Sequence, residues 1–199
     1  MGSYHRRLER TVIEVTVNFP CFLDPAMIYK AIDPNLWENK IMKIISAYGH
    51  ESEMLELVTE YTNSILEQGA EVASCLKAQH LDDELKDMKT KYGLPYGRMY
   101  LALVEGDIAG CVALTKNDED YCEIKRLYLR PQFRGKGISK ALIERIITDA
   151  RKIGYKYMRL DTFPFMKSAI KLYEKYGFYF IEKYNDNPAE TAVFMQLNL

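Results

Sequence analysis

The sequence predicts one α/β domain with α+β layering, in which helices flank a mixed, mostly antiparallel sheet. Short runs that alternate apolar and polar residues are interspersed with longer segments whose apolar residues recur at helical spacing. Gly and Pro residues separate these segments, and strand and helix patterns follow one another along the chain. With 199 residues, 48% of them apolar and 28% charged, the chain can bury one sizeable core.

The first 39 residues form a predicted N-terminal extension. Residues 11–19 alternate apolar and polar side chains, as a half-buried strand does. Asp24-Pro25 and Asp33-Pro34 each offer an N-cap followed by a proline at the first helical position, which predicts two short helices. The extension either covers a sheet edge or joins a homodimer interface, and both alternatives remain open.

Residues 40–199 are predicted to form the main domain, and its first half contains two helices and four strands. Helices are expected over residues 52–68, where Gly69 stops the helix, and over residues 72–90. Strands are expected at residues 41–47, 98–104, 108–115 and 121–129, the last three joined as hairpins.

The second half of the main domain repeats the alternation of helix and strand. Its predicted helices cover residues 136–153 and 165–176, and a glycine stops each of them. Its predicted strands cover residues 155–161, 178–183 and 191–197.

Composition and charge exclude several classes of protein. A formal net charge of -1 argues against a surface built to bind a long polyanion, so no nucleic-acid partner is expected. No apolar run approaches the roughly 18 residues of a membrane span, and no signal peptide is apparent, which favours a cytoplasmic location. The cysteines and histidines are too scattered for a zinc site, so no metal is expected. Cys111 and Cys122 lie in strand-like runs and are interpreted as buried apolar filler.

The segment L-R-P-Q-F-R-G-K-G-I, residues 129–138, lies between a predicted strand and a long predicted helix. Gly135 and Gly137 allow a tight turn and a close approach of the backbone to a ligand. The following helix would aim free N–H groups and its positive dipole end at an anion such as a pyrophosphate. Between Ile124 and Ile143 there are six basic residues and no acidic one: Lys125, Arg126, Arg130, Arg134, Lys136 and Lys140. On spacing alone, a glycine-containing connection without a ligand remains an alternative.

Two motifs carry a resemblance to a known family. Gln132-x-x-Gly135-x-Gly137 resembles the acetyl-CoA signature Q/R-x-x-G-x-G/A of the GNAT superfamily of N-acetyltransferases. Residues 169–178, A-I-K-L-Y-E-K-Y-G-F, resemble the second signature of that family, a helix ending in L-Y-x-x-x-G-F. The motifs follow in the family's order with a predicted strand between them. The resemblance covers roughly residues 40–199.

The resemblance implies a GNAT-like acyl-CoA N-acyltransferase fold and an enzyme that uses acetyl-CoA as co-substrate. The acetyl group would pass by direct attack to the primary amine of a small molecule or peptide. In the family, the pantetheine arm lies beside the strand before the first signature, here Leu127, Tyr128 and Leu129. The pyrophosphate would be held by the loop residues Gln132, Arg134, Gly135, Lys136, Gly137, Ile138 and Ser139. Met166 departs from the family, since many members carry Asn there and bond the cofactor arm with it.

Two residues match catalytic positions of the family. An alkylammonium has a pKa near 10.4, so direct attack needs a group that takes a proton, and Glu123 matches the general base of some members. A surface ion pair of Glu123 with Lys125 is the alternative. Tyr173 matches the general-acid tyrosine, although a phenol with a pKa near 10 would favour hydrogen bonding to a thiolate over full proton transfer. A tyrosine on the core stripe of its helix is the alternative.

Two other classes of protein remain open from the sequence. A non-catalytic acyl-CoA-binding or regulatory module would share the signatures without turnover. A nucleic-acid-binding protein that uses residues 125–140 is disfavoured by the near-zero net charge. The resemblance to the GNAT superfamily implies that the acceptor cleft is built by residues 52–90 and the late loop at residues 185–190.

Overall fold

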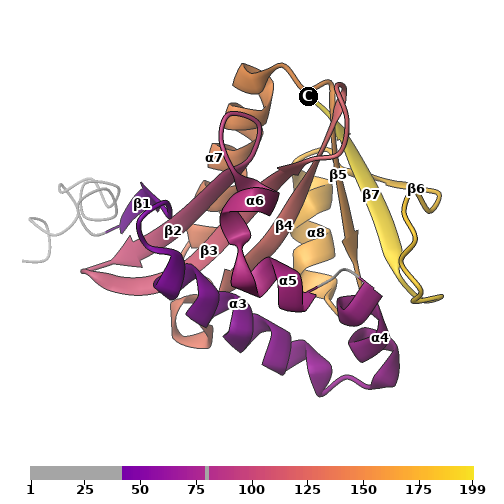
Figure 1. The fold of residues 1–199 in the computed structure, drawn as a ribbon, viewed down its shortest axis with the longest axis horizontal. Coiled ribbons are helices and arrows are strands. Elements are labelled where there is room, and N and C mark those ends of the chain that lie inside the picture. The colour runs from indigo at the N-terminus through magenta and orange to yellow at the C-terminus, as the bar shows by residue number, and fades with distance from the viewer. Residues whose placement is uncertain (1–41, 79–80) are drawn as a thin grey trace, which may run out of the picture. The chain divides into compact units, whose positions relative to one another are not determined.

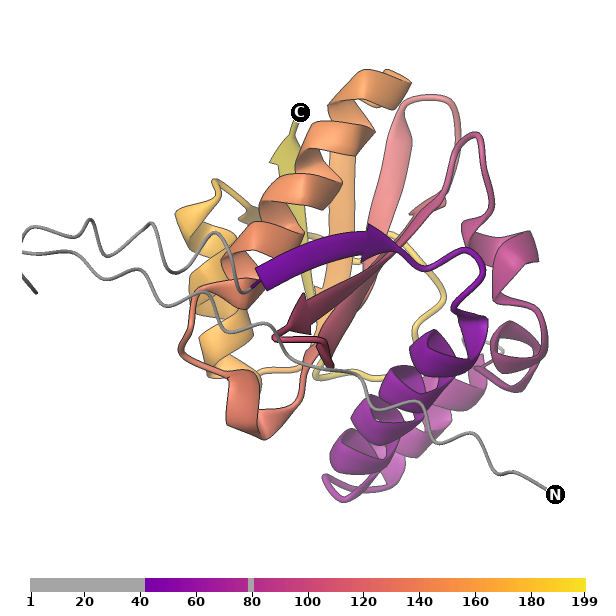
Figure 2. The same ribbon diagram turned by 90° about the vertical axis from the view of Figure 1, so that its left-hand side faces the viewer.

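The computed structural model describes residues 42–78 and 81–199. They form a seven-stranded sheet in the order β1-β2-β3-β4-β5-β7-β6. Helices lie on both faces of the sheet (Figures 1 and 2). The predicted fold class is confirmed. The predicted strand and helices at residues 11–39 lie outside the described residues.

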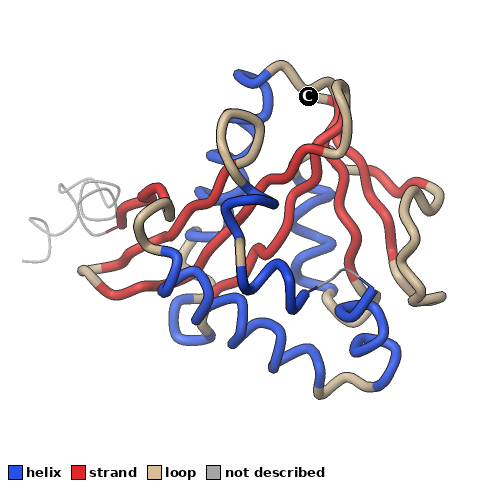
Figure 3. The backbone as a smooth tube through the Cα atoms, viewed as in Figure 1, coloured by secondary structure: helices blue, strands red, loops and turns tan. Residues whose placement is uncertain are grey.

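The strands alternate with helices as the sequence predicts (Figure 3). The strands are β1 (Met42–Ser46), β2 (Arg98–Val104), β3 (Asp107–Lys116), β4 (Tyr121–Leu129), β5 (Tyr157–Thr162), β6 (Tyr179–Ile181) and β7 (Val193–Asn198). The helices are α3 (Glu51–Leu66), α4 (Ala70–Ala78), α5 (Leu81–Lys86), α6 (Met88–Tyr92), α7 (Ile138–Ile153) and α8 (Lys167–Lys175). None of the described helices is long and apolar enough to cross a membrane.

The helix predicted over residues 72–90 is wrong in its length, because three short helices, α4 to α6, occupy this region. The Asp87 side chain accepts a hydrogen bond from the Thr90 N–H at 3.1 Å and caps α6. The backbone of Asp87 is extended, with φ −146° and ψ 79°, so the preceding helix cannot continue through it. Asp87, within a segment whose apolar residues recur at helical spacing, therefore marks the start of a new helix.

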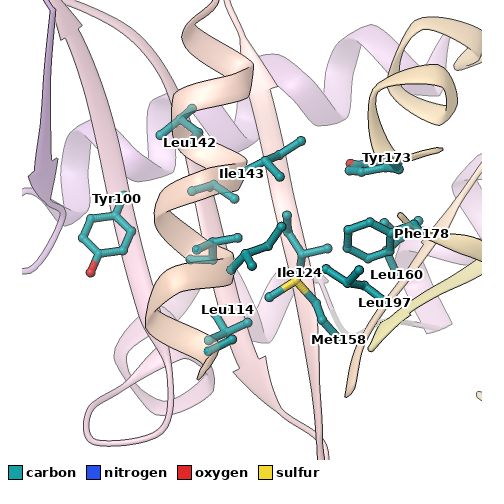
Figure 4. Close-up of a cluster of buried hydrophobic side chains, with 14 of the residues drawn as sticks. Tyr100, Leu114, Ile124, Leu142, Ile143, Met158, Leu160, Tyr173, Phe178 and Leu197 are labelled. Atoms are coloured by element: carbon teal, nitrogen blue, oxygen red, sulfur yellow. The ribbon is translucent and has the colours of Figure 1, made fainter. Parts of the chain in front are cut away.

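Alternation along the strands gives the sheet two apolar faces. On one face α7 and α8 pack on a core that includes Ile124, Leu160 and Leu197 (Figure 4). On the other face α3 and α6 pack over Met99, Leu101 and neighbouring side chains of β1 to β4. Cys111 and Cys122 are buried as predicted, one on each face, and burial raises the pKa of both thiols.

The pairing of β4 with β5 positions the site. It is the one parallel pair among the described strands, and its register ends at Glu123↔Arg159. Beyond this point the two strands run apart, as Figure 1 shows. Backbone groups of the second half of β4 are therefore not paired with β5. A gap that opens inside the sheet is a place where a ligand can lie against strand backbone.

Candidate active site

A groove of about 770 Å³ lies along the carboxyl end of β4, the loop after it and α8. Its volume lies within the range of small-molecule and cofactor sites. Its lining comes from α3 (Tyr61, Ser64, Ile65), β4 (Leu127, Tyr128, Leu129), the loop and α7 (Arg134, Gly135, Gly137, Ile138, Ser139, Lys140), and the segment through α8 (Phe165, Met166, Lys167, Ser168, Ala169, Lys171, Leu172, Lys175).

The loop between β4 and α7 has the geometry of an anion cradle. Gly135 and Gly137 adopt left-handed φ values of 76° and 78°, which favour glycine. A Cβ added at either glycine would meet no protein atom within 4 Å, so the space beside the backbone is open. Gly137 is the N-cap of α7 and brings no side-chain cap, and the first turn holds no acidic residue. The first N–H groups of α7 lack intrahelical acceptors and suit an anionic ligand.

Eight of the ten residues expected to hold the cofactor line this groove. Gln132 and Lys136 do not. Gln132 lies exposed in the 3-10 turn Pro131–Phe133, and the exposed Lys136 has its ammonium 5.5 Å from the centre of the Phe133 ring.

The basic cluster predicted from residues 125–140 is smaller than the sequence suggests. Two of the arginines form ion pairs with glutamates of the helices that cover the sheet. Arg126 pairs with Glu84, and Arg130 pairs with Glu56 and Glu60. Lys125 is buried against the sheet, where it pairs with the carboxylates of Glu123 and Asp161. Charge counted along the sequence missed these partners because they lie tens of residues away.

Three lysines of α8 replace some of that charge. Lys167, Lys171 and Lys175 are four residues apart, so they follow one face of the helix, and all three line the groove. Within the described part of the chain, none of the three forms an ion pair. Their spacing was a signal in the sequence that the motif analysis did not use.

A cavity of about 50 Å³ adjoins the groove where β4 and β5 diverge. Tyr61, Ile65, Leu127 and Met166 line both spaces. The Met166 sulfur accepts hydrogen bonds from Thr162 Oγ1 at 3.4 Å and from Tyr61 Oη at 4.0 Å. At the position where the family often has Asn, this chain thus places a soft acceptor that is already engaged.

Tyr173 lines the small cavity and also belongs to the core. It is 8% exposed, and its ring centre is 5.5 Å from that of Phe178. Its hydroxyl forms no hydrogen bond with the residues that the structure describes. Burial raises the pKa of this phenol, with further contributions from Tyr61 and Asp161. The core position and the catalytic position proposed for Tyr173 are therefore compatible.

Glu123 lies beyond the small cavity, in a group of four side chains that we call the Glu123 cluster (Glu123, Lys125, Asp161, Tyr184). Glu123 is 6% exposed. Its Oε1 lies 2.5 Å from Lys125 Nζ and accepts a hydrogen bond from Tyr184 Oη at 2.9 Å. The predicted ion pair with Lys125 exists, but it is buried and not at the surface. Both contacts involve Oε1, so Oε2 has no hydrogen-bond partner among residues 42–78 and 81–199.

Lys125 and Asp161, two other members of the Glu123 cluster, keep their charges. Lys125 Nζ also lies 3.4 Å from Asp161 Oδ1. Burial lowers the pKa of Lys125, but Glu123 and Asp161 raise it further than burial lowers it. Burial raises the pKa of Asp161, and Lys125 with the amides of Asn187 and Asn185 outweighs it, so the net shift is downward. Asp161 thus anchors the late loop that we expect to border the acceptor cleft.

A second buried group, the Glu84 cluster (Glu84, Lys91, Tyr92, Arg126), lies one residue further along β4. A β-bulge gives Arg126 a positive φ of 56°. Arg126 Nε and Nη2 donate to the two oxygens of Glu84 at 2.6 and 2.8 Å. Tyr92 Oη and Lys91 Nζ each donate to Glu84 at 2.7 Å. Burial raises the pKa of Glu84, but Arg126 and Lys91 prevail and lower it to about 2.

Comparison with known families decides the identity of this fold. The model of the acetyltransferase (GNAT) family matches residues 56–178, which contain the loop, the divergent strands and α8. The chain belongs to the acetyltransferase (GNAT) family. The resemblance drawn from the two motifs is confirmed.

A relative in sequence agrees with the GNAT assignment, and solved structures share the fold. A Schizosaccharomyces pombe protein named as an uncharacterized N-acetyltransferase is 40% identical over 126 residues, which is 62% of this chain and 77% of that protein. An acetyltransferase of Streptococcus agalactiae shares the fold with a TM-score of 0.65 and 22% identity, over 79% of this chain and 98% of that one. An acetyltransferase of Salmonella typhimurium, solved with its cofactor acetyl-CoA, has a TM-score of 0.59 and 18% identity over 79% of this GNAT chain and 94% of its own.

Proposed function

We propose that this GNAT protein transfers an acetyl group from acetyl-CoA to the primary amine of a small molecule or peptide. The observation that carries the proposal is one continuous path through the domain. It begins at the Gly135–Gly137 loop, follows the groove along the unpaired part of β4, and reaches the small cavity beside Tyr173 and the Glu123 cluster.

The groove suits the parts of a coenzyme A molecule. The amides at Gly135, Gly137 and the first turn of α7 would bind the pyrophosphate. Arg134 and the three α8 lysines supply positive charge for the phosphates. The backbone of Leu127, Tyr128 and Leu129 lacks β5 partners and would bond the pantetheine arm. Acetyl-CoA supplies an activated thioester, and the remaining steps need proton handling by this chain.

Glu123 takes the proton of the acceptor in this proposal. A free alkylammonium has a pKa near 10.4 and is a poor nucleophile until it is deprotonated. Oε2 of Glu123 is free to accept that proton, directly or through one water, while Lys125 and Tyr184 hold Oε1 in place. Overall, an ammonium and a thioester give an amide, a thiol and one released proton.

Tyr173 stabilises the leaving thiolate. A CoA thiol has a pKa near 8.5, and the pKa of Tyr173 is raised above that of an ordinary phenol. Full proton transfer from Tyr173 to the thiolate is therefore strongly uphill. Tyr173 acts as a hydrogen-bond donor, and the thiolate takes its proton from solvent.

Calorimetric titration with acetyl-CoA tests the site. We expect the wild-type protein to bind acetyl-CoA with micromolar affinity. Gly135→Val places a side chain in the cradle and should abolish this binding. Gly106→Val is the matched control, because Gly106 also has a positive φ and open space around its Cβ position but lies in the β2–β3 hairpin. Both variants carry the same kind of backbone strain, so they separate loss of the ligand from loss of stability.

Three results would count against the proposal. Equal affinity in wild-type and Gly135→Val protein would exclude the loop as the pyrophosphate site. No binding by the wild-type protein would exclude acetyl-CoA as donor. Binding without thiol release for any amine would favour a non-catalytic acyl-CoA-binding or regulatory module instead.

The cytoplasmic location and the homodimer stay predictions from the sequence. Sedimentation of the purified protein and imaging of a tagged copy in cells would test them.

A further inference from the structure

We propose that Arg159 binds a carboxylate of the acceptor, so that the substrate class is an amine that also carries a carboxylate, such as an amino acid. This inference rests on the proposed acetyl transfer and extends it to the acceptor. Arg159 belongs to a group that we call the Arg159 clamp (Tyr121, Arg159, Tyr184, Gln196).

Arg159 lies next to the candidate base. It is the β5 partner of Glu123 in the last registered pair before the two strands diverge. Both side chains are on the sheet face opposite Met158 and Leu160, which pack in the core beneath α7 and α8. Neighbouring strands are roughly 4.8 Å apart, so a ligand the size of one amino acid can contact both side chains.

The clamp holds the guanidinium of Arg159 in place and leaves its two terminal nitrogens without a hydrogen bond to the described residues. The guanidinium carbon lies 3.7 Å from the centre of the Tyr121 ring and 5.0 Å from that of Tyr184. Its Nε donates to Gln196 Oε1 at 3.0 Å. Among the described residues no carboxylate pairs with Arg159, and its two terminal nitrogens form no hydrogen bond. By contrast, Arg126, Arg130 and Arg145 are each paired with a carboxylate.

An arginine held in this way is preorganised for a carboxylate. Its planar fork can donate two parallel hydrogen bonds, and the stacked rings restrict its rotamers before the ligand arrives. Tyr184 joins this side chain to the base, because its hydroxyl donates to Glu123 while its ring faces Arg159. An acceptor would thus meet negative charge at its ammonium and positive charge at its carboxylate.

This side of the sheet is accessible from a direction different from that of the groove. Figure 1 shows α6 in front of the middle of the sheet and α3, α5 and α4 along its lower edge, and none of the described helices lies over β7 and β6 on that side. Tyr179 on β6, which accepts a hydrogen bond from Gln196, is 43% exposed. The acceptor can therefore approach the clamp from solvent while the groove holds the donor.

Matched acceptor pairs test the inference. Thiol release from acetyl-CoA is measured with free α-, β- and γ-amino acids and with the carboxamide of each one. We expect at least one acid to exceed its carboxamide roughly 10- to 100-fold in kcat/KM, mainly through KM, which is the range of a hydrogen-bonded charge. Arg159→Gln should remove this preference and leave the carboxamide rates within a few-fold. Arg159→Lys should restore part of it, and Arg151→Gln, an exposed cation of α7, should change nothing.

Other outcomes overturn the inference. Equal use of acids and carboxamides would do so, and so would an Arg159→Gln variant that lowers kcat for both alike, since the clamp would then be structural. A protein that binds acetyl-CoA but acetylates only spermidine, or no acid at all, contradicts the inference alone. Failure to bind acetyl-CoA at all contradicts the proposed function, so the two failures are distinguishable.

Discussion

Two buried charge clusters lie side by side on β4, and they differ in one respect. In the Glu84 cluster both carboxylate oxygens of Glu84 are occupied, by Arg126, Lys91 and Tyr92. In the Glu123 cluster two donors share Oε1 of Glu123, and Oε2 has no partner within the described ranges. The first cluster is satisfied, whereas the second has unused hydrogen-bonding capacity beside a cavity.

The difference shows how one strand can contribute one cluster to the stability of the fold and another to proton transfer. The bulge at Arg126 sends that side chain to α5, which ties the divergent half of β4 to the helices over the sheet. Glu123 lies before the bulge, where β4 still pairs with β5. We therefore assign stability to the Glu84 cluster and proton transfer to the Glu123 cluster.

The largest expected effect is on turnover in Glu123→Gln. Loss of the proton acceptor should lower kcat roughly 10²- to 10⁴-fold, while the affinity for acetyl-CoA changes little. Lys125 keeps Asp161 as a partner, so the loss of unfolding free energy should be smaller than in Glu84→Gln. Steady-state thiol release and calorimetry measure the two quantities. Glu84→Gln, assayed where it is folded, is the matched control and should keep kcat within a few-fold. A kcat for Glu123→Gln near that of wild type would remove Glu123 from the mechanism.

Glu84→Gln should have the opposite profile. Removing one charge of a buried pair leaves Arg126 uncompensated, which typically costs about 3–5 kcal/mol of unfolding free energy. Urea unfolding of this variant beside Glu119→Gln gives the comparison, because Glu119 forms an exposed pair with Lys116 that contributes little to stability. Similar losses in both variants would show that the Glu84 cluster does not support the fold.

Acid should destabilise the protein through the same cluster. The pKa of Glu84 is lowered from 4.5 to about 2 in the folded state, so its contribution is complete above pH 4.5 and is lost as pH falls toward 2. The loss amounts to at most about 3 kcal/mol. Unfolding free energies measured across this window should fall more steeply for wild type than for Glu84→Gln. Parallel curves would contradict the pairing.

The sequence predicted the fold and the groove better than it predicted the charges around them. Strand alternation, helix periodicity and glycine stops gave the order of the described elements, because those signals are local. The nearby sequence could not show which of the six basic residues around the loop are available to a ligand. The carboxylates that pair with Arg126 and Arg130 belong to Glu56, Glu60 and Glu84, on helices far away in the sequence. Asp161 and Arg159 belong to no recognised motif, and only the folded sheet brings them and Tyr184 beside Glu123.

Tyr173→Phe should have a smaller effect than the changes to either carboxylate. Losing a hydrogen bond to a developing thiolate should lower kcat roughly 10-fold and leave acetyl-CoA affinity unchanged. The phenylalanine ring keeps the packing on Phe178, so stability is expected to hold. Equal turnover in the two proteins would leave Tyr173 with its core role alone.

The smallest effect is expected for Lys171→Gln. This change removes one of the three groove lysines and should weaken acetyl-CoA binding by up to about 10-fold at low salt, with a smaller difference at high salt. Lys152→Gln, at the far end of α7, is the control for a simple change in net charge. Equal affinities at low salt would exclude α8 as a source of phosphate contacts.

The most direct test is a crystal structure of the protein with acetyl-CoA bound. The account predicts the pyrophosphate at the amides of Gly135, Gly137 and the first turn of α7, and the thioester beside Tyr173 on the side of the Glu123 cluster. A coenzyme bound outside the groove, or a thioester that lies toward the Glu84 cluster and away from Glu123, would contradict it.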